Sequence, residues 1–180
     1  MENNMHIMVD LETMGTRPNA PIVSIGAVMF NADGIHERFY RNVSLASAVH
    51  SGAVIDPNTV MWWMGQSEDA RTALVDETAG SIADALRDLG KMVCGPNDAL
   101  VGVWGNGASF DNVIVSESCR RLGMAPLWEF WKDRCYRTVK SAYPDVKLER
   151  TGVHHNALSD AETQAEHLIR INEASGGIIL

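Results

Sequence analysis

The pattern of apolar and polar positions along the chain predicts strands and helices in a definite order. Short runs rich in apolar, β-branched and aromatic residues predict strands. These runs are "HIMVDLE" (6–12), "PIVSIGAVMFN" (21–31), "GIHERFYRNV" (34–43) and "ALVGVWG" (99–105). The sequence "NADG" between the second and third runs is typical of a hairpin turn, so we expect the first three strands to form an antiparallel meander.

Helical spacing and capping residues predict helices in other segments. "SIADALRDLGKMV" (81–93) has apolar residues at helical spacing, and residues 56–77 are expected to hold one or two short helices that begin with Asp-Pro. A helix is predicted over 109–123, with Ser109 as its cap and Gly123 at its end. The remaining predicted elements are a short strand running into a helix within 130–144 and a last helix over 156–177, ended by Gly176 and Gly177.

This order of elements predicts an α/β fold. The antiparallel strands come first, and the later alternation of helices and strands predicts parallel additions to the same sheet, with helices packed on it. No internal repeat, low-complexity tract or linker divides the 180 residues. We therefore expect a single domain over residues 1–180.

The composition, the N-terminal sequence and the cysteines predict the cellular location of the protein. Hydrophobic residues make up 46% of the chain, yet no apolar run approaches the roughly 20 residues that span a bilayer. The N-terminal sequence "MENNMHIMVD" lacks the basic and long apolar regions of a secretory signal. The three cysteines, Cys94, Cys119 and Cys135, are far apart and form no C-x-x-C motif, which favours free thiols in a reducing cytoplasm over a zinc site.

The net charge of −8 argues against a generic nucleic-acid binder, but the charge is uneven. Between Lys132 and Arg150 there are six basic residues and three acidic ones. This local excess is compatible with a patch that faces phosphates and equally with a solvated helix face.

The first predicted strand carries two acids on one face. Side chains alternate along a strand, so Asp10 and Glu12 in "VDLETMG" share the face opposite Val9. Two like charges side by side repel, and burying either is costly unless a cation lies between them. The alternative is that the strand stops at Val9 and both acids extend into water.

Two further acids begin predicted helices. Asp111 lies in the first turn of its helix and starts a stripe that faces the sheet, at a helix N-terminus where a carboxylate is favoured. Asp160 lies near the start of the last helix, which begins either at an Asn156 cap or at Ser159, with Glu162 completing a capping box. His155 lies just before that helix or at its edge.

These four acids and one histidine are expected to converge. Sites in open α/β sheets form outside the carboxyl ends of the parallel strands, and the acids lie at such ends if the first and fourth strands are neighbours. Four carboxylates require cations, and hard oxygen ligands select Mg²⁺ or Mn²⁺ over zinc or copper.

Three segments of the sequence that contain these residues resemble the motifs of a known family. "DLET" near the N-terminus, "NGASFDN" in mid-chain and "HHNALSDA" near the C-terminus match, in order, the three motifs of the DEDDh 3′–5′ exonucleases, which include proofreading subunits and oligoribonucleases. "NTVMWWMGQSEDAR" and "FWKDRCYRTVK" resemble segments of a small phage and bacterial subgroup, so the resemblance covers nearly the whole chain. It implies a ribonuclease H-like fold, a mixed five-stranded sheet flanked by helices.

The resemblance also implies a mechanism. Two Mg²⁺ or Mn²⁺ ions would be held by Asp10, Glu12 and Asp160, with Asp111 acting through bound water. Two such ions stabilise the attacking and leaving oxygens of a phosphoryl displacement. His155 would take a proton from the attacking water, for which an unperturbed imidazole pKa of about 6.5 is suitable. Single-stranded RNA or DNA would lose nucleoside 5′-monophosphates from its 3′ end.

The resemblance implies that Thr13, Met14 and Gly15 contact the terminal nucleotide, although a turn built only for its geometry is the alternative for Thr13. Asn106 in the mid-chain motif and Phe110 beside Asp111 are further candidate substrate contacts, with core packing as the alternative for Phe110. The mid-chain motif departs from the family at Gly105, where a histidine more often stands, which affects substrate contacts rather than the reaction.

The sequence leaves alternatives open for the roles of two tryptophans, the quaternary state and the substrate. Trp62 and Trp63 are candidates for stacking on a base, but adjacent helical positions point about 100° apart, so one of them is expected in the core. "PLWEFW" (126–131) could serve a homodimer interface or the core equally well. A ribonuclease H-type endonuclease and a non-catalytic nucleic-acid-binding module are the alternative functions. The choice between RNA and DNA stays open.

Overall fold

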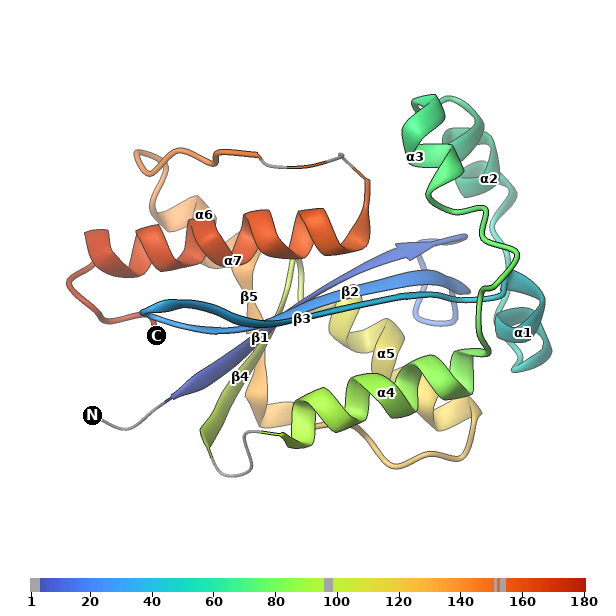
Figure 1. The fold of residues 1–180 in the computed structure, drawn as a ribbon, viewed down its shortest axis with the longest axis horizontal. Coiled ribbons are helices and arrows are strands. Elements are labelled where there is room, and N and C mark those ends of the chain that lie inside the picture. Colours follow the sequence, from blue (N-terminus) through green and yellow to red (C-terminus); the bar gives the residue numbers. More distant parts are fainter. Residues whose placement is uncertain (1–3, 96–98, 151, 153–154) are drawn as a thin grey trace.

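The β-strands form one five-stranded sheet with the order β3-β2-β1-β4-β5 (Figure 1). A computed structural model describes residues 4–95, 99–150, 152 and 155–180. The strands are β1 (Met5–Thr13), β2 (Ile22–Asn31), β3 (Gly34–Asn42), β4 (Leu100–Gly105) and β5 (Asp133–Cys135). β2 pairs antiparallel with both β1 and β3, whereas β4 pairs parallel with both β1 and β5. The predicted mixed sheet is therefore confirmed.

Helices occupy most of the predicted segments. They are α1 (Leu45–His50), α2 (Pro57–Met64), α3 (Glu68–Thr72), α4 (Ile82–Cys94), α5 (Asp111–Arg121), the 3₁₀ helix η2 (Phe130–Lys132), α6 (Tyr136–Ala142) and α7 (Ala157–Ala174). The segment 56–77 forms two helices, and α1 is a helix that the sequence pattern did not predict. No helix within the described residues has the length and apolar character needed to cross a membrane.

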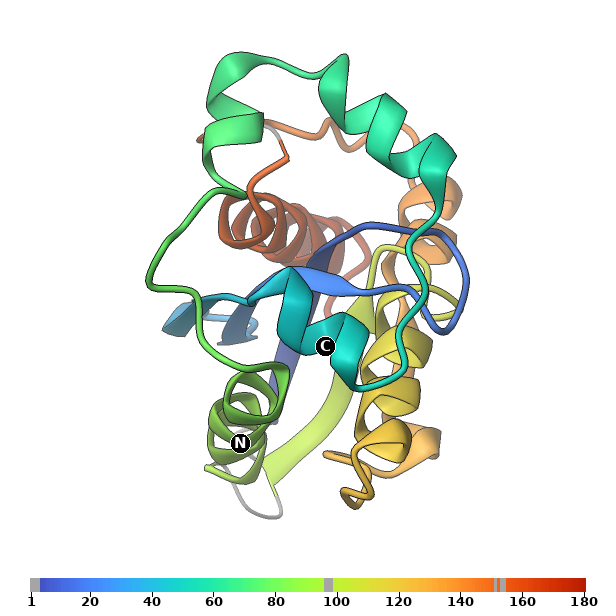
Figure 2. The same ribbon diagram turned by 90° about the vertical axis from the view of Figure 1, so that its right-hand side faces the viewer.

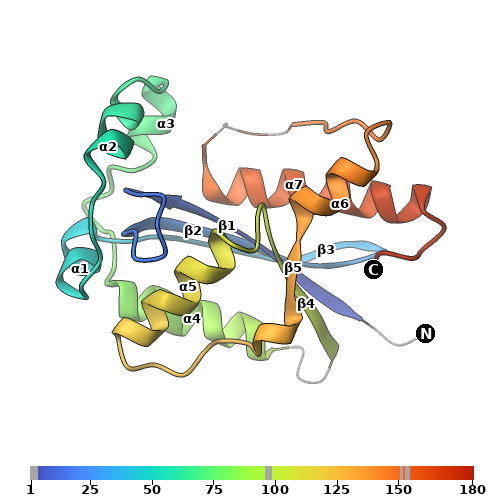
Figure 3. The same ribbon diagram turned by 180° about the vertical axis from the view of Figure 1, so that it is seen from behind.

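The helices cover both faces of the sheet. α6 and α7 lie on one face, and α4 and α5 lie on the other (Figures 1 and 3). α2 and α3 stand beyond the end of the sheet at which β1 finishes, as the view from that side shows (Figure 2). This end is where the candidate acids lie.

β1 separates two apolar cores by the alternation of its side chains. Ile7, Val9 and Leu11 belong to the core that includes residues of α4 and α5. Met8 belongs to the second core, which includes residues of α6 and α7. Side chains two apart share a face, so Asp10 and Glu12 lie with Met8 on the face opposite Val9, as predicted, and α7 covers that face.

Local sequence signals mark several turns and helix ends as predicted. Asn31 pairs with Gly34 across the two-residue hairpin. The Asp56 side chain caps α2, and the Asn156 side chain caps α7 by accepting from the backbone N–H of Ser159, so the alternative start at Ser159 is wrong.

The ends of α5 and α7 form Schellman motifs. After α5, the N–H of Gly123 donates to the Arg120 carbonyl and the N–H of Met124 donates to the Cys119 carbonyl. After α7, Gly176 and Gly177 make the equivalent bonds, both with positive φ. Glycine adopts this left-handed conformation without strain, which explains the predicted helix ends.

The predicted cap of α5 is wrong. Ser109 lies in a turn, and the helix begins two residues later at Asp111, with Phe110 at the cap position and no side-chain cap hydrogen bond. The Phe110 N–H donates to the Gly107 carbonyl over 2.7 Å, so this turn delays the helix.

Gly26 in β2 allows the start of α7 to lie directly on the sheet. A Cβ at Gly26 would lie 2.1 Å from the carbonyl carbon of Ala157, the first residue of α7. Gly26 is paired with Asp10 across the sheet, so this contact brings α7 beside the acid-bearing end of β1.

We expect Gly26→Ala to destabilise the protein by about 3 kcal/mol, because the added methyl must displace backbone rather than a flexible side chain. Urea unfolding measures the change. Gly80→Ala is the control: nothing lies within 4 Å of a Cβ there, and about 0.5 kcal/mol or less is expected. Equal stability of the two variants would show that α7 can move away from β2 at little cost.

Candidate active site

The carboxyl end of β1 carries two acids on the face covered by α7. β1 continues to Thr13, and the Glu12 side chain is 7% exposed. The alternative in which the strand stops at Val9 and leaves the acids in water is therefore excluded. Asp10 is half-buried and accepts a hydrogen bond from Nε2 of Gln164 on α7 over 2.7 Å.

Asp111 joins this end of the sheet from α5. It is the first residue of that helix, which follows β4, and it is 2% exposed. Its Oδ1 accepts the backbone N–H of Leu11 at 3.2 Å. Because Leu11 lies between Asp10 and Glu12, this bond holds the start of α5 against the acid-bearing part of β1.

Asp160 and His155 come from the start of α7 and the segment before it. The backbone N–H of His155 donates to Oδ2 of Asp160 over 3.0 Å, and Nη1 of Arg150 donates to Oδ1 over 2.9 Å. His155 has a φ of 62°, a left-handed conformation that is uncommon outside glycine. Its neighbour in the "HHNALSDA" motif, His154, lies outside the described residues.

A single pocket of about 230 Å³ brings the five predicted catalytic residues together. Its lining includes Asp10, Glu12, Asp111, His155 and Asp160, together with the predicted substrate contacts Asn106 and Phe110. Potential ligand atoms of Glu12, His155 and Asp160 all lie within 4.8 Å of one another, a spacing that could hold a metal ion. Asp10 and Asp111 share the pocket but not that group of three.

The electrostatics of the pocket favour cation binding. Burial, followed by the charges of Asp160 and Asp111, raises the pKa of Glu12 to about 8. Burial likewise raises the pKa of Asp111 to about 7, although hydrogen bonds from backbone N–H groups oppose the shift. The pKa of Asp10 is also raised, chiefly by burial and then by the three neighbouring acids. A bound cation would relieve this repulsion and restore the charged forms.

The structure adds residues that sequence reasoning missed. Gln164, Thr163 and Tyr136 also line the pocket. Gln164 lies four residues after Asp160 on α7, so its helical position could have indicated that both face β1. No sequence signal indicated Tyr136. Its hydroxyl hydrogen-bonds the ring of His167, 31 residues away on another helix, and this contact depends on how the two helices pack.

A neighbouring pocket holds other predicted substrate contacts. Thr13 and Gly15 line it together with Glu12, Phe110 and both tryptophans. Met14 lines neither of these two pockets; its carbonyl accepts the N–H of Asp56 at the start of α2.

The two tryptophans have different environments, as predicted. Trp63 is 4% exposed and donates its Nε1–H to the Thr13 carbonyl over 3.0 Å, which ties α2 to the end of β1. Trp62 is 46% exposed, and its ring centroid lies 5.0 Å from that of His155 in an edge-on arrangement. α2 therefore touches both the acid-bearing strand and the candidate base.

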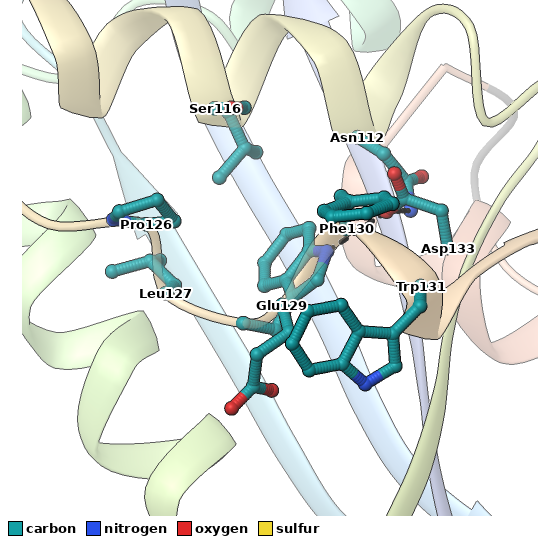
Figure 4. A pocket seen from close by; sticks show the side chains of 10 residues that line it. Asn112, Ser116, Pro126, Leu127, Glu129, Phe130, Trp131 and Asp133 are labelled. Atoms are coloured by element: carbon teal, nitrogen blue, oxygen red, sulfur yellow. Dashed lines mark hydrogen bonds between the residues drawn. The ribbon is translucent and has the colours of Figure 1, made fainter.

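A third pocket lies under the aromatic segment 126–131 (Figure 4). Trp128 donates to Asp133 and packs against the core, whereas Phe130 and Trp131 are 78% and 62% exposed. The core alternative is therefore confirmed for Leu127 and Trp128, and the interface alternative stays a prediction for Phe130 and Trp131. Asp10, Glu12, Asp111 and Asp160 do not line this third pocket.

Solved structures with this fold include several exonucleases. The nuclease domain of 3′hExo, a DEDDh family member bound to rAMP, superposes with a TM-score of 0.65 at 14% identity, over 97% of this chain and 94% of that one. E. coli Exonuclease I in complex with a dA16 oligonucleotide gives a TM-score of 0.65 at 13% identity, over 94% of this chain and 41% of that one. These matches confirm the ribonuclease H-like fold.

Sequence comparison identifies the family. Curated protein sequences show no significant match. The family model described as the 3′–5′ exoribonuclease Rv2179c-like domain matches residues 5–172, a range that contains all three motifs. The chain therefore belongs to the Rv2179c-like 3′–5′ exoribonuclease domain family and is a 3′–5′ exonuclease of the DEDDh type.

Proposed function

We propose that the protein removes nucleoside 5′-monophosphates from the 3′ end of single-stranded nucleic acid. The observation that carries the proposal is the convergence of four acids and an imidazole in one pocket. RNA is the substrate that the family description favours, and DNA is the alternative. The solved relatives include complexes with a DNA oligonucleotide and with a histone mRNA stem-loop.

The pocket fits a pair of divalent cations such as Mg²⁺ or Mn²⁺. Carboxylate oxygens are hard ligands, and burial of several of them together is unfavourable without positive charge. In our proposal Asp10, Glu12 and Asp160 hold the ions, and Asp111 acts through water. When bound, the ions would supply charge stabilisation to the attacking and leaving oxygens of the displacement.

In this proposal His155 acts as the general base, and other groups of the protein orient the acids. An imidazole nitrogen of His155 takes the proton of the attacking water as its oxygen bonds to phosphorus. The bond from phosphorus to the 3′ oxygen of the preceding nucleotide breaks, and that oxygen takes a proton from solvent. Gln164 orients the Asp10 carboxylate through its hydrogen bond, and the N–H of Leu11 orients Asp111.

Basic side chains on the pocket wall support binding of a polyanion by an acidic protein. Arg137, Lys140 and Arg150 line the catalytic pocket, and all three belong to the basic stretch 132–150. Positive charge is thus concentrated beside the acids despite the net charge of −8. The neighbouring pocket with Thr13, Gly15 and Phe110 is the proposed site of the terminal nucleotide.

Matched 5′-labelled RNA and DNA single strands test the proposal in Mn²⁺ or Mg²⁺. A ladder that shortens from the 3′ end is expected, with RNA degraded faster. Internal cuts would instead indicate a ribonuclease H-type endonuclease, and tight binding of intact strands would indicate a non-catalytic module. No product in the presence of either ion would contradict the proposal.

Cellular location and assembly are further parts of the proposal. The free thiols of Cys94, Cys119 and Cys135 suit the cytoplasm. Phe130 and Trp131 offer exposed aromatic surface for a homodimer, which light scattering of the purified protein would detect.

A further inference from the structure

We propose that Arg150 alternates between two anionic partners: Asp160 when no divalent cation is bound, and a phosphate of the substrate once a cation has taken its place. The inference rests on the proposed function, because it concerns the same pocket. It gives Arg150 a role in substrate binding that depends on prior metal binding.

Asp160 is the point of competition. Its Oδ1 accepts from Nη1 of Arg150 at 2.9 Å, and its Oδ2 accepts from the N–H of His155 at 3.0 Å. Asp160 also belongs to the group whose potential ligand atoms lie within 4.8 Å of one another. A guanidinium bound to this carboxylate repels a cation that binds the same carboxylate, so the two positive groups compete for Asp160.

The Arg150 side chain is more exposed to solvent than that of Asp160. The Arg150 side chain is 52% exposed and Asp160 is 14% exposed. When the pair separates, water solvates the half-exposed guanidinium, whereas the largely buried Asp160 carboxylate needs another positive group in its place. Asp160 is part of α7, whose first turn is fixed on the sheet at Gly26.

The pocket offers Arg150 a second position. Arg150 lines the same cavity as Arg137 and Lys140. Nη2 of Arg137 donates to the Asn106 carbonyl at 2.7 Å, so that guanidinium is already held on the pocket wall. A guanidinium released from Asp160 would join this basic wall, where its planar array of donors matches a phosphodiester.

The arrangement predicts opposite effects on two ligands when Arg150 is replaced. Without the guanidinium, a cation meets no competitor at Asp160 and should bind more tightly. A strand of nucleic acid loses a phosphate contact and should bind more weakly. A purely structural role for Arg150 would weaken both.

The first test is calorimetric titration of the protein with MnCl₂. Arg150→Met should tighten Mn²⁺ binding about fivefold relative to the natural protein. Arg150→Lys keeps a competing charge and should lie close to the natural value. Lys91→Met is the control, because Lys91 pairs with Asp88 on α4, on the opposite face of the sheet from α7; its Mn²⁺ affinity should be unchanged.

The second test is the binding of a fluorescein-labelled single-stranded RNA, measured by anisotropy in a His155→Asn background to suppress hydrolysis. With saturating Mn²⁺, Arg150→Met should weaken RNA binding about tenfold. In EDTA the same substitution should change RNA binding less than twofold, since Arg150 is then engaged by Asp160. Circular dichroism verifies that each variant is folded.

Three outcomes would overturn the inference. Unchanged or weaker Mn²⁺ binding by folded Arg150→Met would show that the guanidinium does not compete, even if the protein hydrolyses RNA as proposed. Equal loss of RNA affinity with and without Mn²⁺ would show that Arg150 has no second, metal-dependent position. Absence of Mn²⁺ binding by the natural protein would overturn the proposed two-metal site together with the inference.

Discussion

Glu12→Gln should raise the melting temperature of the metal-free protein by about 5 °C at pH 8.5 and slow hydrolysis at least about a thousandfold. The gain in stability arises because Glu12 is buried among other acids, which raises its pKa to about 8. Glutamine keeps the shape and removes the charge. The loss of activity arises because the same charge is proposed to bind the cations.

The sign of the pH dependence follows from the raised pKa values. Between the usual carboxyl range near pH 4 and the folded value near 8, the folded protein holds a proton on Glu12 that the unfolded chain has released. Stability of the metal-free protein therefore falls as pH rises through this window, and Asp111, whose pKa is about 7, contributes in the same direction.

Differential scanning fluorimetry from pH 5 to 9, with EDTA or with Mg²⁺, measures these effects. The natural protein in EDTA should lose stability toward high pH, and Mg²⁺ should restore it. Glu12→Gln should flatten the EDTA profile, whereas Glu77→Gln, on an exposed loop, should not. A Glu12→Gln protein that is no more stable than the natural one at pH 8.5 would mean that the acids do not repel one another as the geometry implies.

His155→Ala should lower turnover by about a thousandfold while leaving Mn²⁺ affinity within about threefold, because general-base catalysis contributes about 10²- to 10⁴-fold. His155→Asn should behave alike, and asparagine tolerates the left-handed backbone found at this position. Steady-state hydrolysis and calorimetric titration give the two quantities separately.

The control is His50→Ala, since His50 is exposed on α1. It should leave both quantities unchanged. If His155→Ala loses Mn²⁺ affinity in proportion to turnover, His155 is a metal ligand rather than the base. Its ring nitrogen lies within 4.8 Å of potential ligand atoms of Glu12 and Asp160, a distance that would explain such a role.

Much of the fold follows from local sequence. Alternation of side chains places Asp10 and Glu12 on the face opposite Val9 in any strand, whatever lies around it. Helix ends at Gly123 and Gly177 depend on backbone conformations that glycine adopts more easily than other residues. The order of the strands and of the helices apart from α1, and the acids at their ends, therefore followed from local sequence.

Other features were outside the reach of local patterns. The start of α5 is set by a turn that ends in the bond from Phe110 to Gly107, so the local capping signal at Ser109 misled the prediction. Trp63 hydrogen-bonds the Thr13 carbonyl, whereas Trp62 lies against the His155 ring. Both partners lie far from the tryptophans in sequence, so local patterns could not assign these contacts.

The sequence by itself determined which residues could carry the chemistry, because residue type, strand alternation and helix capping are local properties. Only the tertiary structure decided how the charges meet. Gln164 binds Asp10 across 154 positions in the sequence, and Arg150 binds Asp160 across 10 positions. Such contacts depend on how α7 settles on β1 and β2, which is a property of packing between distant segments and not of any one of them.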